Sequence, residues 1–322
     1  MCSVGAELML RITIFLMQNN VGYNQFQKDF CLRWEKMKKI IHNKPIISCI
    51  KVFLVCCIAR IIEYFLIRTD ETILAENFMH KIFGTGVLLF VLISKKITWS
   101  HIGFTKNNVV KKVLKGLALG GFCFFIAYLV ECTLLFCMNG NVQISVYTSG
   151  FSLNGEAVKQ KGIIFILLCI AFNIINVWME EGIFRGLFMH LLKGKMSFNA
   201  AMFFIALLFG VWHWVMPMRD YIEGDSNIGN LLVMGIGYIV LAGIMSIKWS
   251  ILYTLTESLW MGIGDHLFNN VVVTNLLHLI SNNETDSMQI VRILMGQLIS
   301  FLLVVIYYKK RERVSEDVYE LE

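Results

Sequence analysis

Long apolar runs, separated by short polar or charged links, make up most of the 322-residue chain. An α-helix rises about 1.5 Å per residue, so about 20 apolar residues cross the roughly 30 Å hydrocarbon core of a bilayer. The runs therefore predict membrane-spanning helices, of which the second is the shortest. The expected spans are residues 46–67, 78–93, a third run that ends near Met138, 162–192, 199–214, 228–247, 251–274 and 290–308.

The composition indicates the same class of protein. Hydrophobic residues make up 57% of the chain and charged residues 16%, and the mean hydropathy is +0.64. So few polar side chains cannot cover the surface of an ordinary soluble domain. We predict an all-α polytopic membrane protein, in which about eight transmembrane helices form a single bundle.

The positive charges lie at the ends of the apolar runs. The net charge is +6, and basic links alternate along the chain with acidic or neutral ones. The basic residues form no continuous face, so we expect membrane lipid as a partner and no nucleic acid. Because cytoplasmic loops are enriched in Lys and Arg, both chain termini are predicted to be cytoplasmic.

This topology divides the chain into three parts. We predict a cytoplasmic N-terminal extension at residues 1–45, the transmembrane bundle at 46–308 and a basic cytoplasmic tail at 309–322. Met37 and the two lysines after it resemble a second translation start, so we expect residues 1–36 to be dispensable for insertion and activity. The nine cysteines show no C-x-x-C pair and no metal-type spacing, which favours buried free thiols.

Three charged residues, Glu180, Glu181 and Arg185, lie inside the apolar run 162–192. An ionised side chain in the membrane interior costs roughly 2.5–3.5 kcal/mol, so such residues usually have a function. Adjacent helical residues point about 100° apart, so the two glutamates serve different roles. Glu181 and Arg185 are four residues apart and can pair, either to support the reactive face or as a simple intrahelical bridge.

Two later spans carry polar groups that can reach the glutamates. His213 ends the fifth span, and His266 and Asn270 lie on one face of the seventh. Counted from the basic residues at the expected cytoplasmic ends, Lys248 among them, Glu180 lies roughly 20 Å deep and each histidine roughly 27 Å. Helix tilt absorbs a difference of about 7 Å. We expect a common pocket, although a single buried histidine often bonds only to the backbone.

These residue types suit peptide hydrolysis. A carboxylate held away from bulk water is a good general base, so Glu180 is predicted to activate a water molecule. Imidazole and carboxamide groups can donate hydrogen bonds to the oxyanion that forms when water attacks an amide carbonyl. We assign His213, His266 and Asn270 to that role.

Three motifs in separate spans carry a family resemblance. They are Glu180-Glu181-x-x-x-Arg185, Phe209-x-x-x-His213 and His266-x-x-x-Asn270. In this order, residues 162–274 resemble the CAAX prenyl protease and bacteriocin-processing family, the CPBP or Abi-type intramembrane endopeptidases. The resemblance implies a glutamate-activated water, the six motif residues as the catalytic set, no required cofactor, and a substrate that is a peptide or a lipidated protein such as a prenylated CAAX protein.

Two alternatives stay open, a zinc site and a non-catalytic protein, whereas a match to an aspartyl-protease motif is incomplete because Asp265 is the only aspartate in the expected spans. Zinc could be held by Glu180, His213 and His266 from three helices. The G-x-G-D sequence that ends at Asp265 matches a motif of intramembrane aspartyl proteases, whose chemistry needs two aspartates. A non-catalytic membrane protein, such as a bacteriocin immunity factor, a scaffold or a transporter, also uses buried carboxylates and histidines.

Three smaller patterns predict local contacts. Gly116 and the glycine four residues later have the small-x-x-x-small spacing that lets helices approach closely. Arg60 and Glu63 are three residues apart and are expected to neutralise each other. Trp212 and Trp214 are expected at the membrane boundary, where indoles are favoured, with the lining of a substrate groove as the alternative.

Overall fold

The computed structural model describes residues 45–72, 76–139, 141–149, 162–281 and 286–319, so the prediction for residues 1–36 lies outside the described chain. The described chain is mainly helical, which confirms the all-α membrane class. Within the described residues, six helical segments are long and apolar enough to cross a membrane: Pro45–Glu71, Val109–Met138, Ile163–Leu192, Phe198–Glu223, Ile228–Thr256 and Gln289–Arg311. This protein is therefore a multi-pass integral membrane protein.

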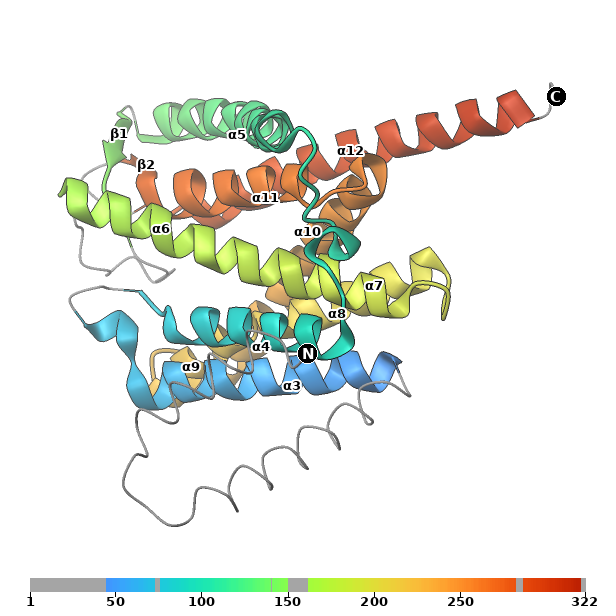
Figure 1. Cartoon of the computed structure of the whole chain (residues 1–322). Coiled ribbons are helices and arrows are strands. Elements are labelled where there is room, and N and C mark those ends of the chain that lie inside the picture. The colour runs from blue at the N-terminus through green and yellow to red at the C-terminus, as the bar shows by residue number, and fades with distance from the viewer. Residues whose placement is uncertain (1–44, 73–75, 140, 150–161, 282–285, 320–322) are drawn as a thin grey trace, which may run out of the picture.

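Figure 1 shows how the helices are arranged along the chain. In chain order they are α3 (Pro45–Ile62), η1 (Glu63–Ile67), η2 (Thr69–Glu71), α4 (Met79–Lys95), η3 (Trp99–Ile102), α5 (Val109–Asn139), α6 (Ile163–Glu180), η4 (Glu181–Phe188), α7 (Met189–Leu192), α8 (Phe198–Trp212), α9 (Val215–Glu223), α10 (Ile228–Thr256), α11 (Trp260–Leu267), η5 (Phe268–Leu276) and α12 (Gln289–Tyr319). Here η1, η4 and η5 are π-helical, and η2 and η3 are short 3₁₀ turns.

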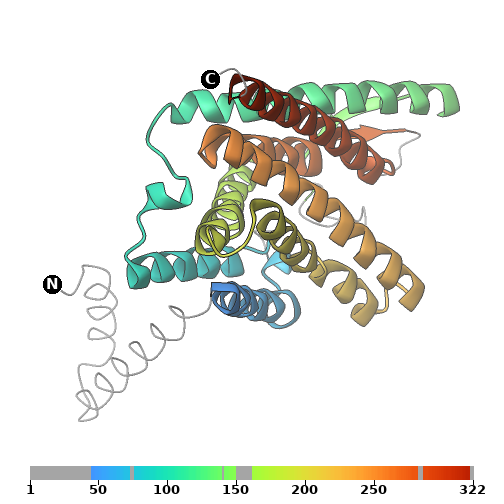
Figure 2. The same ribbon diagram turned by 90° about the vertical axis from the view of Figure 1, so that its right-hand side faces the viewer.

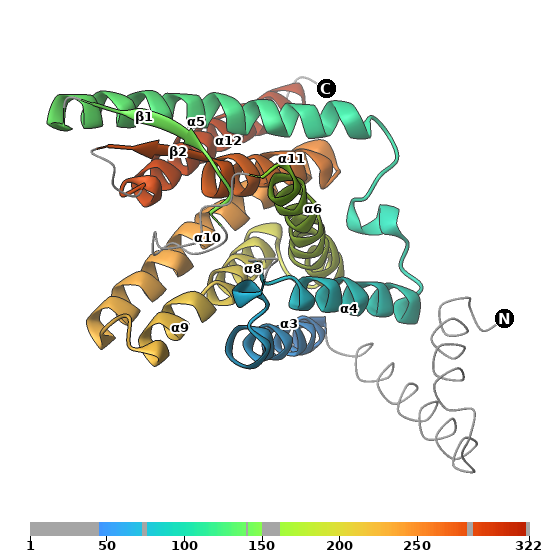
Figure 3. The same ribbon diagram turned by 90° about the vertical axis from the view of Figure 1, so that its left-hand side faces the viewer.

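Helix α6 lies in the middle of the bundle. Figures 1 and 3 show α5, α11 and α12 on one side of it and α3 and α4 on the other. In Figure 2 the same helix is seen nearly end-on between these two groups. Its continuation η4 is buried throughout, so the segment with the two glutamates is enclosed by the other helices.

Close packing of α5 on α11 depends on glycine. A Cβ atom on Gly116 would lie 2.1 Å from the carbonyl oxygen of Met261, and one on Gly264 would lie 2.2 Å from that of Val113. Gly120, four residues after Gly116, lies against the Phe268 side chain. The predicted small-residue contact is confirmed, and it fixes the helix that carries His266.

Two predicted span boundaries are wrong. Helix α10 does not end near residue 247 but continues to Thr256, and the next helix begins at Trp260 instead of residue 251. The cause is Lys248, which is fully buried and pairs with Asp265 instead of marking a helix end. Lys248 therefore does not mark the cytoplasmic end of a helix, and the predicted depth of His266, which was counted from Lys248, is wrong.

The polar link after α5 contains a strand that the sequence did not predict. β1 (Gln143–Val146) pairs antiparallel with β2 (Leu277–Ile280), which follows η5 directly. A two-stranded pair is marginal alone. Here Tyr147 stacks on His278 at 3.9 Å between ring centroids, and His278 lies 3.2 Å from Asp286.

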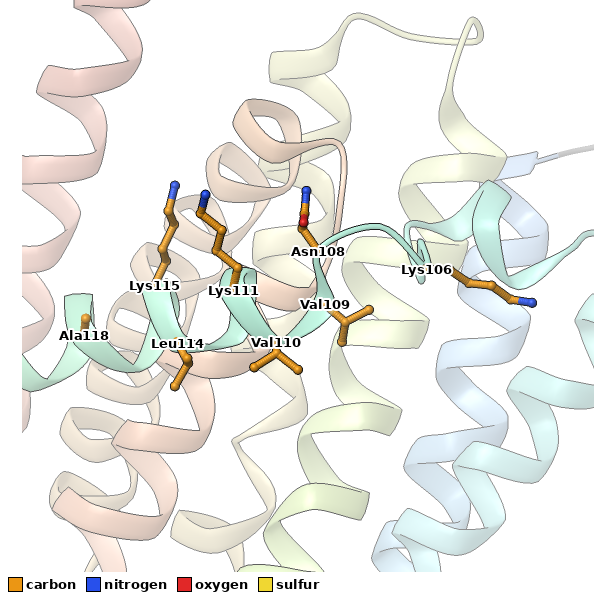
Figure 4. A pocket seen from close by; sticks show the side chains of 8 residues that line it. All are labelled: Lys106, Asn108, Val109, Val110, Lys111, Leu114, Lys115 and Ala118. Carbon is orange, nitrogen blue, oxygen red and sulfur yellow. The ribbon is translucent and has the colours of Figure 1, made fainter.

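The start of α5 has the pattern of a membrane boundary. Lys111 and Lys115 extend from one face of its first turns, and the exposed Val110 and Leu114 extend from the opposite face (Figure 4). Lysine stems and apolar side chains separate in this way where a helix leaves the lipid. The cytoplasmic location of both termini stays a prediction, as does the division at residues 45 and 308, past which α12 continues to Tyr319.

Candidate active site

The two glutamates lie where the main helix changes its geometry. Glu180 is the last residue of α6, and Glu181 begins the π-helical η4. A second π-helical segment, η5, begins two residues after His266 and contains Asn270. Such wide turns are uncommon and often occur at functional sites, because they turn side chains away from the regular helical pattern.

Glu180 has one satisfied oxygen and one free oxygen. Its Oε1 accepts a hydrogen bond from Trp212 Nε1 at 2.8 Å. Its Oε2 is buried without a hydrogen-bond partner and lies 3.6 Å from His266 Nε2. That separation is too long for a direct hydrogen bond, but one water molecule can reach both atoms.

Glu181 supports His266 from behind. The guanidinium of Arg185 donates from Nε to Oε2 of Glu181 at 2.8 Å and from Nη2 to Oε1. His266 Nδ1 lies 2.9 Å from the same Oε1. Since an ionised carboxylate only accepts, Nδ1 carries the proton, and Nε2 of a neutral His266 presents its lone pair towards Glu180. The predicted Glu181–Arg185 pair is present, and it is more than an intrahelical bridge because it also holds α11.

His213 is fixed in the same way by the backbone. Its Nδ1 donates to the carbonyl oxygen of Phe209 at 2.8 Å, which leaves Nε2 free to act. His213, His266, Glu180 and Asn270 all line one cavity of about 210 Å³. The structure thus brings these four predicted residues together, whereas Glu181 and Arg185 lie behind the cavity wall.

A chain of amide groups orients Asn270. Lys248 Nζ donates to Gln297 Oε1 at 2.7 Å, Gln297 Nε2 donates to Asn269 Oδ1 at 2.9 Å, and Asn269 Nδ2 donates to Asn270 Oδ1 at 2.9 Å. A lysine ammonium can only donate, so each amide in the chain must accept on one side and donate on the other. The Nδ2 group of Asn270 is then left as the donor for the cavity. We call Lys248, Gln297 and Asn269 the amide relay.

Lys248 itself is fully satisfied. Besides Gln297, its ammonium contacts Asp265 Oδ2 at 2.5 Å and donates to Ser300 Oγ at 2.7 Å. Asp265 Oδ2 also accepts from Trp249 Nε1 at 2.7 Å, and the Trp249 ring stacks on His266 with 3.9 Å between centroids. Asp265, the last residue of the G-x-G-D sequence, therefore binds Lys248 and also holds the Trp249 ring that stacks on His266.

The zinc alternative finds no support in the arrangement of side chains. Among the described residues, no three or more His, Cys, Asp or Glu side chains are grouped so that they could hold a metal ion, and this includes Glu180, His213 and His266.

Sequence reasoning misplaced or missed three residues at this site. Trp212 is only 2% exposed and bonds to Glu180, so its predicted place at the membrane boundary is wrong. Arg60 does not pair with Glu63, whose carboxylate is bonded instead to the backbone and ring of His80. Lys248, predicted to mark a helix end, is buried within α10. The one available signal was the presence of Arg60 and Lys248 inside or next to apolar runs.

Comparison with known families supports the motif-based assignment. Residues 162–272 match the family model described as Rce1-like, type II CAAX prenyl endopeptidase. The match confirms the resemblance drawn from the three motifs, and it covers the chain from the start of α6 into η5. Comparisons with the curated proteins and with the solved structures each found no significant match.

Proposed function

We propose that this protein is an intramembrane endopeptidase of the CAAX-protease type that uses a glutamate-activated water. The observation that carries the proposal is the free Oε2 of Glu180, which lies 3.6 Å from His266 Nε2 at the wall of a cavity. A water molecule in reach of both atoms has a base on one side and an imidazole that fixes its orientation on the other.

The proposed reaction begins when the water oxygen attacks the carbonyl carbon of the scissile peptide bond. The proton that the water loses passes to Glu180 Oε2, and the carbonyl oxygen becomes an oxyanion. When the C–N bond breaks, Glu180 returns that proton to the leaving amine nitrogen. The products are a carboxyl terminus and a free amine, and the glutamate ends in its starting state.

The other cavity residues are assigned to stabilising the oxyanion and positioning the water. Asn270 Nδ2, oriented by the amide relay, is the neutral donor that we assign to the oxyanion. With Nδ1 of each histidine already donating, His213 and His266 act through Nε2, as acceptors that position the water or, when protonated, as further donors. Glu181 and Arg185 are positioning residues, because they act on the substrate only through His266.

The cavity wall supports an apolar or lipidated substrate. Beside the polar groups it is lined by apolar side chains from α10 and α12: Met234, Leu241, Ala242, Met245, Ile290, Ile293 and Leu294. Methionine adapts its shape to irregular apolar partners. We propose that a lipid group or an apolar peptide segment lies against this wall while the peptide bond reaches Glu180.

Cleavage by purified protein tests the proposal. We expect protein in detergent or liposomes to cut members of a peptide set that includes prenylated peptides, and Glu180→Gln to lower the rate by at least about 10³-fold, as removal of an essential base does. The glutamine keeps an oxygen for Trp212 Nε1, so the fold should survive. Glu257→Gln, the same change at an exposed turn, is the matched control.

Two results would overturn this mechanism. Full biological effect of the Glu180→Gln and His266→Ala variants would favour the non-catalytic alternative. Loss of cleavage in chelator, restored by added zinc, would replace the glutamate mechanism with a metal mechanism. We expect cleavage to be unchanged in chelator, because the proposed steps use only Glu180, His213, His266 and Asn270.

A further inference from the structure

Arg60 on α3 is a buried cation without an anionic partner. It is 7% exposed and lines the same cavity as Glu180. Its Nη2 donates to the Tyr64 hydroxyl at 3.4 Å, but its Nε and Nη1 are buried without a hydrogen-bond partner. Among the described residues, no carboxylate forms a salt bridge with it: Glu63 is bonded to His80, and Glu180 keeps its Oε2 free at the cavity.

Two aromatic rings contact the face of the Arg60 guanidinium, but Nε and Nη1 donate to no group. The guanidinium carbon lies 4.3 Å from the centroid of the Trp212 ring and 5.2 Å from that of Tyr64. Such contacts engage the flat face of the guanidinium, and they leave the N–H groups at its edge free. Buried charges in proteins are normally paired, so an unpaired buried arginine at a cavity wall indicates a ligand that supplies the anion.

The N–H groups at the edge of the Arg60 guanidinium determine which ligand can bind there. A guanidinium presents two parallel N–H groups that match the two oxygens of a carboxylate, and this pairing is stronger than a bond between neutral groups. Trp212 links this cation to the proposed base, because its Nε1 bonds to Glu180 while its ring face contacts Arg60. A carboxylate on Arg60 and a scissile bond at Glu180 would therefore belong to one short peptide segment.

We propose that Arg60, which lies outside the matched region 162–272, is the residue that binds the C-terminal carboxylate of the peptide substrate. This inference rests on the proposed function, and it adds the group that recognises the substrate end. A cavity of about 210 Å³ has room for only a short segment between the two groups. The same site should accept a long chain on the amino side of the scissile bond, which can extend out of the cavity.

Paired peptides test the proposal. One peptide is made with a free C-terminal carboxylate and with a C-terminal amide, and the two are otherwise identical. Wild-type protein should cleave the free acid with a kcat/KM at least about tenfold higher, mainly through a lower KM, because the amide cannot form the charged pair. Arg60→Gln should remove the preference, so that the ratio of kcat/KM for the free acid to kcat/KM for the amide falls to about one.

A binding measurement separates this proposal from the proposed reaction. Glu180→Gln protein should bind the fluorescent free acid more tightly than the amide, and the Glu180→Gln/Arg60→Gln double variant should bind both equally. This arm gives a result even if no peptide is cleaved. Arg60→Lys keeps the charge without the paired donors and should recover only part of the preference.

Three results would overturn the assignment. Wild-type protein that binds and cleaves acid and amide equally has no carboxylate site. An Arg60→Gln variant that slows both peptides by the same factor would show that Arg60 acts on Glu180 and not on the substrate. An amidated peptide ending in Asp that is cleaved as well as the free acid would reassign the site to acidic side chains.

Discussion

Replacing Lys248 with methionine tests whether a buried lysine orients the proposed oxyanion donor. Methionine fills nearly the same space but donates no hydrogen bond. The change removes the 2.5 Å contact with Asp265 and the 2.7 Å bonds to Gln297 and Ser300. Asp265 is 1% exposed, so it would be left as an unpaired buried charge. Breaking such a pair from one side costs about 3–5 kcal/mol, a large share of the roughly 5–15 kcal/mol that stabilises a folded domain.

A second substitution separates stability from orientation. In Lys248→Met/Asp265→Asn the stranded charge is gone, and the asparagine still accepts from Trp249. We expect this double variant to recover most of the lost stability. Gln297, however, has no fixed donor and can turn either way, so Asn270 loses its defined orientation. We expect kcat to fall about tenfold to a hundredfold, which is less than the roughly 10²–10³-fold effect of removing an oxyanion donor outright.

The assay combines thermal unfolding in detergent with single-turnover cleavage. Asn270→Ala shows how far kcat falls when the oxyanion donor is absent. Asp265→Asn alone keeps two of the three lysine contacts, so it is the control that should retain activity. A double variant that is stable and cleaves as fast as wild type would refute the relay. A Lys248→Met single variant as stable as wild type would refute the charge argument.

Three further changes have defined outcomes. Trp212→Phe removes the hydrogen bond to Glu180 but keeps an aromatic ring. A hydrogen bond to a charged group is worth about 1.5–3 kcal/mol, so kcat should fall by about tenfold or more. A steady-state assay should show little change in KM. Gly264→Ala would place a methyl group 2.2 Å from a carbonyl oxygen of α5 and should lower the unfolding temperature strongly, whereas Gly86→Ala, with nothing within 4 Å, should not. Burial raises the pKa of Asp286, but hydrogen bonds from its histidine and arginine partners lower it by more, so it lies below the ordinary 3.8. Its stabilising effect is therefore complete above about pH 4 and is lost as the pH falls below that, and Asp286→Asn should remove this dependence in unfolding curves measured across pH.

Regular periodicity made part of the site predictable. Glu181 and Arg185 pair because they are four residues apart on one helix. The close packing at Gly116 was predictable because Gly120 follows it four residues later, on the same helix face. The meeting of Glu180, His213 and His266 could be expected from their burial cost and from the order of the motifs. All of these inferences use short separations in the sequence or the general cost of polar groups in lipid.

Contacts between distant segments could not be predicted in this way. The bond from Trp212 to Glu180 and the path from Lys248 to Asn270 depend on which helix faces which, and apolar periodicity does not give the rotation of each helix. The π-helical segments were also missed, since a window of sequence does not distinguish a wide turn from a regular one. The same limitation made a buried lysine look like a helix end.

The order in which the chain is made gives the Lys248 contacts a further consequence. Synthesis proceeds from the N-terminus, so α10 reaches the membrane before the segments that carry Asp265 and Gln297. Until those segments follow, the nascent protein contains an ammonium group without its final partners, at an insertion cost of roughly 2.5–3.5 kcal/mol. Helix α12, which carries Gln297 and Ser300, thus completes the surroundings of Lys248, and chains truncated before α12 should fold less stably than the full chain.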